Sequence, residues 1–531
     1  MTKKLWPLAL GCSTLALAGC GPSDIASPGS SGSVTINNPA PAPTPSPTPT
    51  PVSTVTAAAG CPTIADAQGL TDGGTISGPT GSYRVCTLPS VIKTSSTLPK
   101  VSGLLYELNG RVNVGCDGGF RAPTAAAPVT STTVGCSTAL TADTNVTLTI
   151  AAGAILYGKT GQSWLAVNRG NKINAVGTAT QPIVFTSRDN VLGLNDDTSQ
   201  GQWGGVVLMG RGIVTDCSVG SVASGTCERD TEGSADLARF GGADNTYNAG
   251  RMSFVQIRYS GFVLGADKEL QALTTEGIGS GTTLDHIQAH NSSDDGSEFF
   301  GGAINFKYYI ATGADDDSLD VDTGAQGNFQ YVLQLPRAGR GDALFEIDSN
   351  GFESDTPRTK LNVANFTAIQ PQTSADNEAA DLAASLFRGN SDTTLVNGIL
   401  LAPSNECVRM NGSGTTPATL TARSVVMQCN ATKYLGTGGY TATQVSSFFG
   451  SGSNNNNDAF TPSLTRQFID GANETAVTAT DPKTISSFFD TTTWIGAVRN
   501  ASDTWYAGWT CNSATANFGS TSSACTSLPT T

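Results

Sequence analysis

The segments "LDHIQAH" (residues 284–290) and "FKYYIAT" (residues 306–312) carry the pattern that decides the fold. The second repeats the apolar positions of the first after 22 residues. A repeat of this length fits one coil of a solenoid, in which each coil lays its strands on those of the coil before. The matching apolar positions are Leu284, Ile287 and Ala289 in the first segment and Phe306, Tyr309 and Ala311 in the second.

The same pattern recurs in "MSFVQIR" (Met252, Val255, Ile257), "VNGILL" (Val396, Ile399, Leu401) and "ARSVVM" (Ala422, Val425, Met427). A further copy, "FQYVLQL" from Phe329, fits less well because Gln334 would point inward. Helical periodicity is scarce, and short β-branched strands recur between turn residues. We therefore predict an all-β fold, a right-handed parallel β-helix over residues 146–430. The end coils need covers, which we place at 59–145 and 431–531.

The N-terminus indicates export. Residues 1–19 combine a short basic start with an apolar run too short to span a bilayer permanently, which is typical of a signal peptide. The following "LAGC" resembles the lipobox of bacterial lipoproteins, and this resemblance implies cleavage before Cys20 and its lipidation. Without an aspartate after Cys20, we expect anchoring in the outer membrane. Residues 20–58 are rich in Pro, Thr and Ser and read as an extended tether.

The net charge indicates which partners to expect, and the cysteines indicate the compartment. A formal net charge of −14 argues against nucleic acid and favours divalent cations. Apart from Cys12 and Cys20, the cysteines fall in couples close in sequence, so local disulfides in an oxidising compartment are the simplest account, although spacing cannot prove the pairing. The candidates are Cys61, Cys86, Cys116, Cys136, Cys217, Cys227, Cys407, Cys429, Cys511 and Cys525.

The segment "NSSDDGSEFFGGAINFKYYIATGADDDSLDVD" (residues 291–322) is dense in carboxylates. The 22-residue shift places Asp294 on Asp316, Asp295 on Asp317 and Glu298 on Asp320. Coils about 4.8 Å apart would bring like charges together, which destabilises the fold unless a cation intervenes. Oxygen-rich turns suit Ca²⁺. We predict one or more calcium sites formed by Asp294, Asp295, Asp315, Asp316, Asp317, Asp320 and Asp322.

Two alternatives to calcium stay open. A shift of about 23 residues places Arg340 over Asp317, and Arg337 lies close by, so arginine pairing could neutralise part of the column. The acids could also form a solvated turn. Neither the nonapeptide calcium repeat nor the EF-hand loop is present.

His286 and His290 are the only histidines, and they lie in a segment that reads as strand, so we do not expect them to converge on zinc. The closing "TWIGAVRNASDTWYAGWTC" gathers Trp494, Trp505 and Trp509. We interpret this segment as a hydrophobic plug over the last coil, with an exposed platform for sugar stacking as the alternative.

Together, "GLLYELNGRVNVG", "INAVGTATQPIVFTS", "QWGGVVLMGRG", "SSDDGSEFFGG", "GADDDSLDVD" and "GFESDTPRTKLNVANFT" resemble uncharacterised bacterial surface lipoproteins with a right-handed parallel β-helix of the pectin-lyase-like class. The resemblance covers most of residues 100–510 and implies a fold and a location. It transfers no catalytic residue, since the G-H-G and R-I-K motifs of the polygalacturonases are missing.

The expected function is a binding or structural module, anchored by lipid in the outer membrane and stabilised by Ca²⁺. One alternative is a polysaccharide lyase or glycoside hydrolase, because stacked acids could supply two carboxylates with separated pKa values. Another is an accessory lipoprotein of an outer-membrane transporter.

Overall fold

The structure is a computed structural model that describes residues 54–136, 138–265, 268–349, 354–373 and 383–530. The chain divides into two units, residues 1–51 and 52–531, and the first lies outside the described residues. The expected signal peptide, the lipid site at Cys20 and most of the tether therefore stay predictions. Within the described part, no helix is long and apolar enough to cross a membrane.

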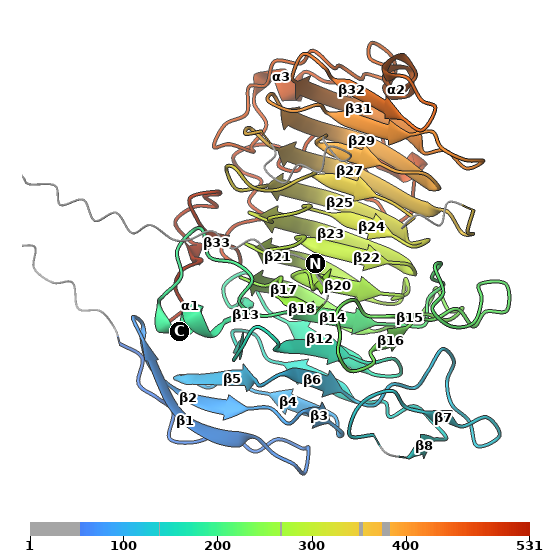
Figure 1. Cartoon of the computed structure of the whole chain (residues 1–531). Coiled ribbons are helices and arrows are strands. Elements are labelled where there is room, and N and C mark those ends of the chain that lie inside the picture. Colours follow the sequence, from blue (N-terminus) through green and yellow to red (C-terminus); the bar gives the residue numbers. More distant parts are fainter. Residues whose placement is uncertain (1–53, 137, 266–267, 350–353, 374–382, 531) are drawn as a thin grey trace, which may run out of the picture. The chain divides into compact units, whose positions relative to one another are not determined.

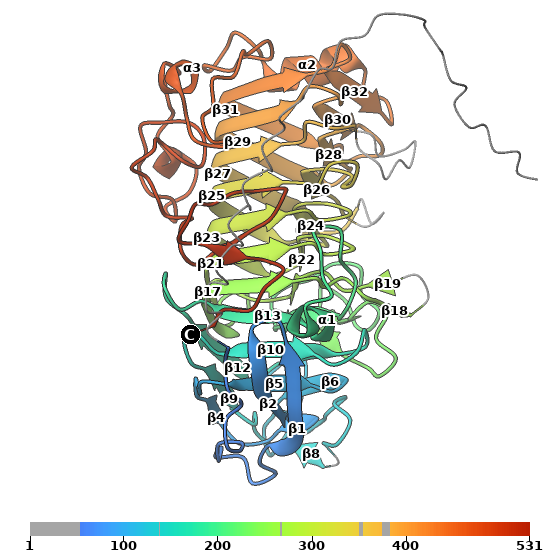
Figure 2. The ribbon, with the colours of Figure 1, turned by 90° about the vertical axis from the view of Figure 1, so that its left-hand side faces the viewer.

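Two long sheets of mostly parallel strands form the body of the second unit (Figures 1 and 2). Sheet 1 follows the order β1 (Thr71–Gly78), β2 (Gly81–Thr87), β5 (Leu104–Leu108), β10 (Ile155–Gly158), β13 (Ile183–Ser187), β17 (Gly250–Arg258), β21 (Thr283–His290), β23 (Ala303–Thr312), β25 (Gln326–Leu335), β27 (Thr359–Ile369), β29 (Ser391–Ala402) and β31 (Thr419–Cys429). Sheet 2 follows the order β3 (Val91–Ile92), β6 (Arg111–Val114), β11 (Trp164–Val167), β14 (Gly205–Met209), β20 (Leu273–Glu276), β22 (Ser297–Phe300), β24 (Asp320–Asp322), β26 (Phe345–Ile347), β28 (Ser385–Phe387), β30 (Val408–Asn411) and β32 (Tyr434–Thr437).

The remaining elements are short. β4 (Ser96–Leu98), β9 (Thr147–Ile150) and β12 (Lys172–Val176) form a branch that joins sheet 1 at β17. Two-stranded pairs lie in the loops: β7 (Val129–Thr130) with β8 (Ala139–Leu140), β15 (Arg229–Asp230) with β16 (Arg239–Phe240), β18 (Val263–Gly265) with β19 (Lys268–Glu269), and β33 (Cys511–Asn512) with β34 (Ser523–Ala524). The helices are α1 (Arg188–Leu192), α2 (Ala442–Phe449), α3 (Ala472–Thr475) and a 3-10 turn at Pro482–Thr484.

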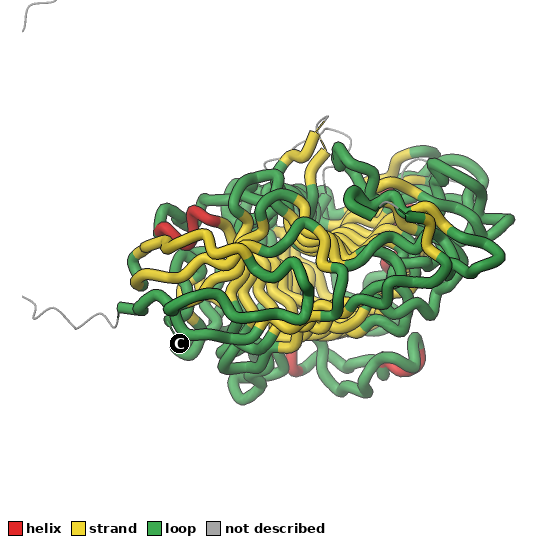
Figure 3. The backbone as a smooth tube through the Cα atoms, turned by 90° about the horizontal axis from the view of Figure 1, so that it is seen from below, coloured by secondary structure: helices red, strands yellow, loops and turns green. Residues whose placement is uncertain are grey.

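The strands of successive coils overlie one another, and the loops lie outside them (Figure 3). The inward side chains of both sheets form one continuous apolar core. Leu284, Ile287 and Ala289 pair with Phe306, Tyr309 and Ala311, so the 22-residue register is confirmed. The positions chosen in "MSFVQIR" and "ARSVVM" are also correct.

The register expected for "VNGILL" is wrong by one residue. Leu395, Gly398 and Leu400 occupy the inward positions, whereas Val396 and Ile399 face outward. A one-residue slip exchanges the two faces of a strand. The sequence is ambiguous here because the outer face of β29 is also covered and apolar. In addition, one inward position is a glycine, which gives no apolar signal: a Cβ at Gly398 would lie 1.9 Å from the Phe366 ring.

The "FQYVLQL" copy stacks in register despite its polar residue. Ala311 pairs with Gln334, which is fully buried as the pattern required. Its Nε2 donates to the Leu344 carbonyl oxygen at 2.8 Å, so the side chain crosses the core to the next turn. A hydrogen bond of this kind offsets part of the cost of burying an amide.

The coils extend beyond the expected boundaries of 146 and 430. β2 already stacks in parallel on β5, and β32 on β30, so the parallel body runs from about Gly81 to Thr437. β1 pairs antiparallel with β2 at the first edge. At the other end α2 places Val445 and Phe449 on the core. Segments expected as caps therefore contribute coils of their own.

The segment after α2 does not plug the last coil. Residues 460–530, here called the C-terminal segment, run back along the outer face of sheet 1 towards β13 (Figure 2). Trp509 contacts Phe254 of β17, and Trp505 contacts Tyr308 of β23. The plug interpretation is wrong because the outer face of sheet 1 is itself apolar and needs covering along its length.

All five couples of cysteines form disulfides, as the local spacing suggested. The pairs are Cys61–Cys86, Cys116–Cys136, Cys217–Cys227, Cys407–Cys429 and Cys511–Cys525. The last holds the end of the C-terminal segment in a closed loop against β21, where Gln288 exchanges two hydrogen bonds with the Cys511 backbone.

Candidate metal centre

The acids stack on the outer face of sheet 2 as the register predicted. Glu298 of β22 pairs with Asp320 of β24, which pairs with Glu346 of β26. Between Asp320 and Asp322, Val321 points into the core, because successive side chains of a strand alternate in direction. The apolar inner positions thus fix the acids on the outer face.

The turns before these strands add a second row of carboxylates, and backbone groups of the next coil hold them. The Asp317 amide donates to Asp295 Oδ1 at 2.9 Å, and the Ala343 amide donates to Asp317 Oδ1 at 2.7 Å. The Asp342 amide donates to the Asp316 carbonyl oxygen at 3.1 Å. These bonds set the carboxylates at the coil spacing before any ligand binds.

A pocket of about 460 Å³, here called the acidic pocket, opens where the rows meet. It contains ten carboxylates and two cationic side chains, so cations of the chain cannot balance its charge. Its lining residues are Glu232, Lys268, Glu269, Gln271, Asp294, Asp295, Glu298, Asp316, Asp317, Asp320, Asp342, Glu346 and Arg388.

Burial and mutual repulsion raise the pKa values of these carboxyls. Burial is the larger cause for Asp294, and nearby Asp316 adds to it, so the pKa rises to about 8. The pKa values of Asp295, Glu298, Asp317 and Asp320 also lie well above the ordinary range, through burial and then neighbouring acids. Burial raises the pKa of Glu346 to about 7 although Arg388 opposes the rise. Protons or another cation must therefore neutralise the pocket.

Three overlapping groups of carboxylates have the geometry of a cation site, each with one oxygen per side chain within 4.8 Å of the others. Asp295 and Asp316 each belong to two groups, so they could bridge neighbouring ions. Carboxylate oxygens alone suit Ca²⁺ better than a transition metal. In addition, Asp320 Oδ1 is buried and has no hydrogen-bond partner among the described residues. The groups are Asp294/Asp295/Asp316, Asp295/Glu298/Asp320 and Asp316/Asp317/Asp342.

Two of the seven predicted ligands lie outside the acidic pocket. Asp315 binds Arg337 at 3.1 Å and Arg340 at 3.2 Å, so the expected arginine pairing exists, but on Asp315 rather than on Asp317. Asp322 lies outside the pocket. Burial, and then Asp348, raise the pKa of Asp322 to about 8, although Arg229 opposes the rise. The structure brings together Asp294, Asp295, Asp316, Asp317 and Asp320.

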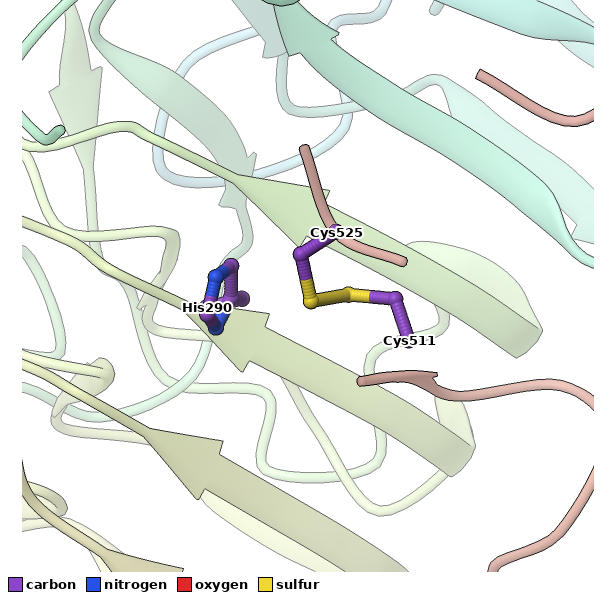
Figure 4. Close-up of side chains that lie close together, drawn as sticks. All are labelled: His290, Cys511 and Cys525. Atoms are coloured by element: carbon purple, nitrogen blue, oxygen red, sulfur yellow. A yellow bond between two sulfur atoms is a disulfide. The ribbon is translucent and has the colours of Figure 1, made fainter. Parts of the chain in front are cut away.

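The two histidines do not converge. His286 is stacked between Phe254 and Tyr308. His290 is fully buried and lies beside Cys511 and Cys525 (Figure 4). The two sulfurs are bonded to each other, so they are not the thiolates that a zinc site needs. Burial, and then Arg258, lowers the pKa of His290 to about 3, which keeps the ring neutral.

Sequence reasoning missed several pocket residues. Asp342 follows Asp316 by 26 residues rather than 22, because the coil is lengthened in the turn after β25. Glu232, Lys268 and Glu269 come from the loops around β15 and β19, outside any repeat. Of these residues, only Asp342 could have been found from the sequence, because it forms an acidic turn directly before "ALFEI".

The stacked parallel sheets and their carboxylate-lined outer face define a parallel β-helix protein. A family model described as a pectate-lyase like beta helix domain matches residues 130–510. This match spans more than half of the chain, and the protein therefore belongs to the pectate-lyase-like β-helix family. No curated protein and no solved structure matches the chain.

Proposed function

We propose that this protein is a binding or structural module that holds Ca²⁺ in the acidic pocket and is anchored by lipid at Cys20 to the outer membrane. The excess of ten carboxylates over two cationic side chains in one pocket carries the proposal. The disulfides and the lipobox-like "LAGC" support placement outside the cytoplasm.

Calcium would act as a structural cross-link between coils. Asp294, Asp316 and Asp342 come from three successive turns, and backbone bonds already hold those turns at the coil spacing. A cation shared by carboxylates of adjacent coils replaces repulsion by attraction. Binding to the native state raises stability as the ligand concentration passes the dissociation constant.

The test is thermal unfolding of the mature chain in EDTA and in Ca²⁺, with metal analysis of the purified protein. We expect a calcium-dependent rise of the melting temperature that is lost in the double variant Asp316→Asn with Asp317→Asn. Asp315→Asn is the matched control, because Asp315 neighbours this pair but is bound by arginines outside the pocket. Absence of bound metal and of any shift would refute the calcium proposal.

A second candidate is calcium-assisted cleavage of an extracellular polysaccharide, favoured by Lys268 and Arg388 in the pocket wall. Arg388 pairs with Glu346 at 3.0 Å and Asp348 at 3.1 Å, so acting as a base would require releasing both pairs. Assays of polysaccharide cleavage with and without Ca²⁺ test this candidate. Calcium-dependent products that disappear in Arg388→Ala would support it, and no cleavage across acidic and neutral polysaccharides would refute it.

A further inference from the structure

The long strands of sheet 1 bend at one equivalent residue per coil, and each of these residues has a positive φ. The φ values lie between 51° and 63°, in the left-handed region. Asparagine tolerates this conformation, whereas it is strained for bulky side chains. The residues, in order along the stack, are Phe254, His286, Tyr308, Tyr331, Asn365, Asn397 and Ser424.

The asparagines at this bend have a clear structural role. Asn365 Nδ2 donates to the Trp494 carbonyl oxygen at 2.9 Å, and Asn397 Nδ2 donates to the Thr480 carbonyl oxygen at 2.8 Å. These bonds hold the C-terminal segment on the body. The aromatic rings at the first four positions cannot make such amide bonds, so their strained backbone needs a different explanation, and strained residues often mark binding sites.

The four rings stack face to face along the coils. Successive centroids are 4.2, 4.2 and 4.7 Å apart, with interplanar angles of 12° to 22°. Trp509 packs edge-on against Phe254 and His286 and so covers the first half of the stack. Tyr308 and Tyr331, the second half, instead line a pocket, to which Tyr308 presents its edge because His286 and Tyr331 cover its two faces.

This aromatic pocket has a volume of about 310 Å³ and is built by two segments far apart in the chain. Tyr308 and Tyr331 come from β23 and β25, and the C-terminal segment adds Trp494 and Trp505. Polar groups complete the wall, namely Arg499, Asn500, Ser502 and Asp503. Small-ligand sites of this size combine an aromatic lining with a few polar groups that fix orientation.

We propose that the aromatic pocket binds a neutral saccharide. A sugar ring offers C–H groups on its faces to aromatic rings, while its hydroxyls pair with donors and acceptors around the edge. The pocket supplies both kinds of partner: the Arg499 guanidinium and Asn500 Nδ2 can donate, and Asp503 and Ser502 Oγ can accept, while Asn500 Oδ1 already accepts from Ser502. Among the described residues, the Trp494 indole Nε1 is a buried donor without an acceptor.

The charges around the pocket favour a neutral sugar over an acidic one. Burial, and then the nearby carboxylates of Asp490 and Asp503, raise the pKa of Tyr308 to about 12. The phenol therefore keeps its proton. The pocket also has no net charge that would attract a uronate, because Arg499 balances Asp503 in its wall and Lys307 pairs with Asp490 at 2.8 Å. An organic cation that packs on the aromatic rings is the competing ligand.

Calorimetric titration of the mature chain with cellohexaose, xylohexaose and mannohexaose tests the proposal, with trigalacturonate and choline as comparators. The titrations are made in EDTA, so that calcium in the acidic pocket plays no part and the two proposals can fail separately. We expect saturable binding of at least one neutral hexaose. Binding of none of the three, or stronger binding of trigalacturonate or choline, would overturn the proposal.

Variants locate the binding. Trp505→Ala and Arg499→Ala should each weaken the affinity by about tenfold. Arg499 is exposed, so its removal leaves folding intact even if Trp505→Ala does not. The matched control is Phe448→Ala, which removes an exposed aromatic ring of α2 outside the pocket. Unchanged affinity in Arg499→Ala together with a folded, unaffected Trp505→Ala would place the sugar elsewhere and refute the site.

Discussion

Two regions of the same β-helix bury carboxylates in opposite ways. In the earlier coils, fully buried Arg169 binds Asp117 at 2.7 Å and Glu228 at 2.5 Å. In the later coils, the acidic pocket stacks carboxylate on carboxylate. Burial pushes the pKa of Asp117 upward, but Arg169 holds it below its usual range, whereas the pKa of Asp294 rises to about 8.

The two regions differ in whether the chain itself neutralises its buried carboxylates. The guanidinium of Arg169 satisfies its two acids within the chain, so that region needs nothing from solution. The acidic pocket keeps an excess of negative charge that only protons or external cations can neutralise. Its stability should therefore depend on added cations and on pH near neutrality, whereas the Arg169 cluster should lose its pairing only in acid.

The largest expected effect is a dependence of stability on pH. In EDTA, the free energy of unfolding should fall as pH rises from about 4 to about 8, because the folded pocket holds protons that the unfolded chain has released. Each such group contributes a slope of about 1.4 kcal/mol per pH unit. Ca²⁺ should flatten the fall by replacing the protons. Denaturant titrations across this range test it, and a flat profile in EDTA would contradict it.

Arg169→Met should cost the next most, about 3–5 kcal/mol of unfolding free energy, because it leaves Asp117 and Glu228 buried without a partner. Arg340→Met is the control, since Arg340 is 55% exposed and its pair with Asp315 should be worth less than about 1 kcal/mol. Denaturant unfolding measures both. Equal losses would show that burial does not distinguish the two pairs.

A carboxylate-to-amide change should have opposite signs in the two regions. In EDTA at neutral pH, Asp320→Asn should stabilise the fold by about 1–2 kcal/mol, because it removes a group that folding forces to take up a proton. Asp117→Asn should destabilise it by breaking the pairing with Arg169. Addition of Ca²⁺ should remove the advantage of Asp320→Asn. Destabilisation by Asp320→Asn in EDTA would contradict the pocket's electrostatics.

The smallest single loss, that of Asn397→Gly, concerns the bend that carries the C-terminal segment. Asn397→Gly should cost about 1 kcal/mol, because it removes the bonds to Thr480 while tolerating the φ of 53°. Asn397→Ala should cost about 1–2 kcal/mol more through backbone strain. Comparing the two variants by thermal unfolding isolates the strain. Equal melting temperatures would mean that the bend relaxes.

Much of the fold could be predicted from the sequence because strand alternation and coil length are local. The pairs Leu284–Phe306 and Glu298–Asp320 follow directly from the 22-residue shift. The error at "VNGILL" arose where both faces of β29 are apolar, so alternation no longer distinguished them. The pocket was predicted in outline, but Glu232 and Glu269 come from loops that follow no repeat.

By itself, the sequence determined the parallel coils and the stacking of the acids, since both depend on residues about one coil apart, and it favoured the local disulfides. Only the tertiary structure decided which charges are paired and where the chain end goes. Arg337 and Arg340 pair with Asp315 rather than with Asp317, because the pairing depends on which side chains can reach one another within the turn. In the C-terminal segment, Cys511 bonds to Gln288, which lies 223 residues earlier in the chain. The segment packs there because it covers an apolar face that exists only once the coils have stacked.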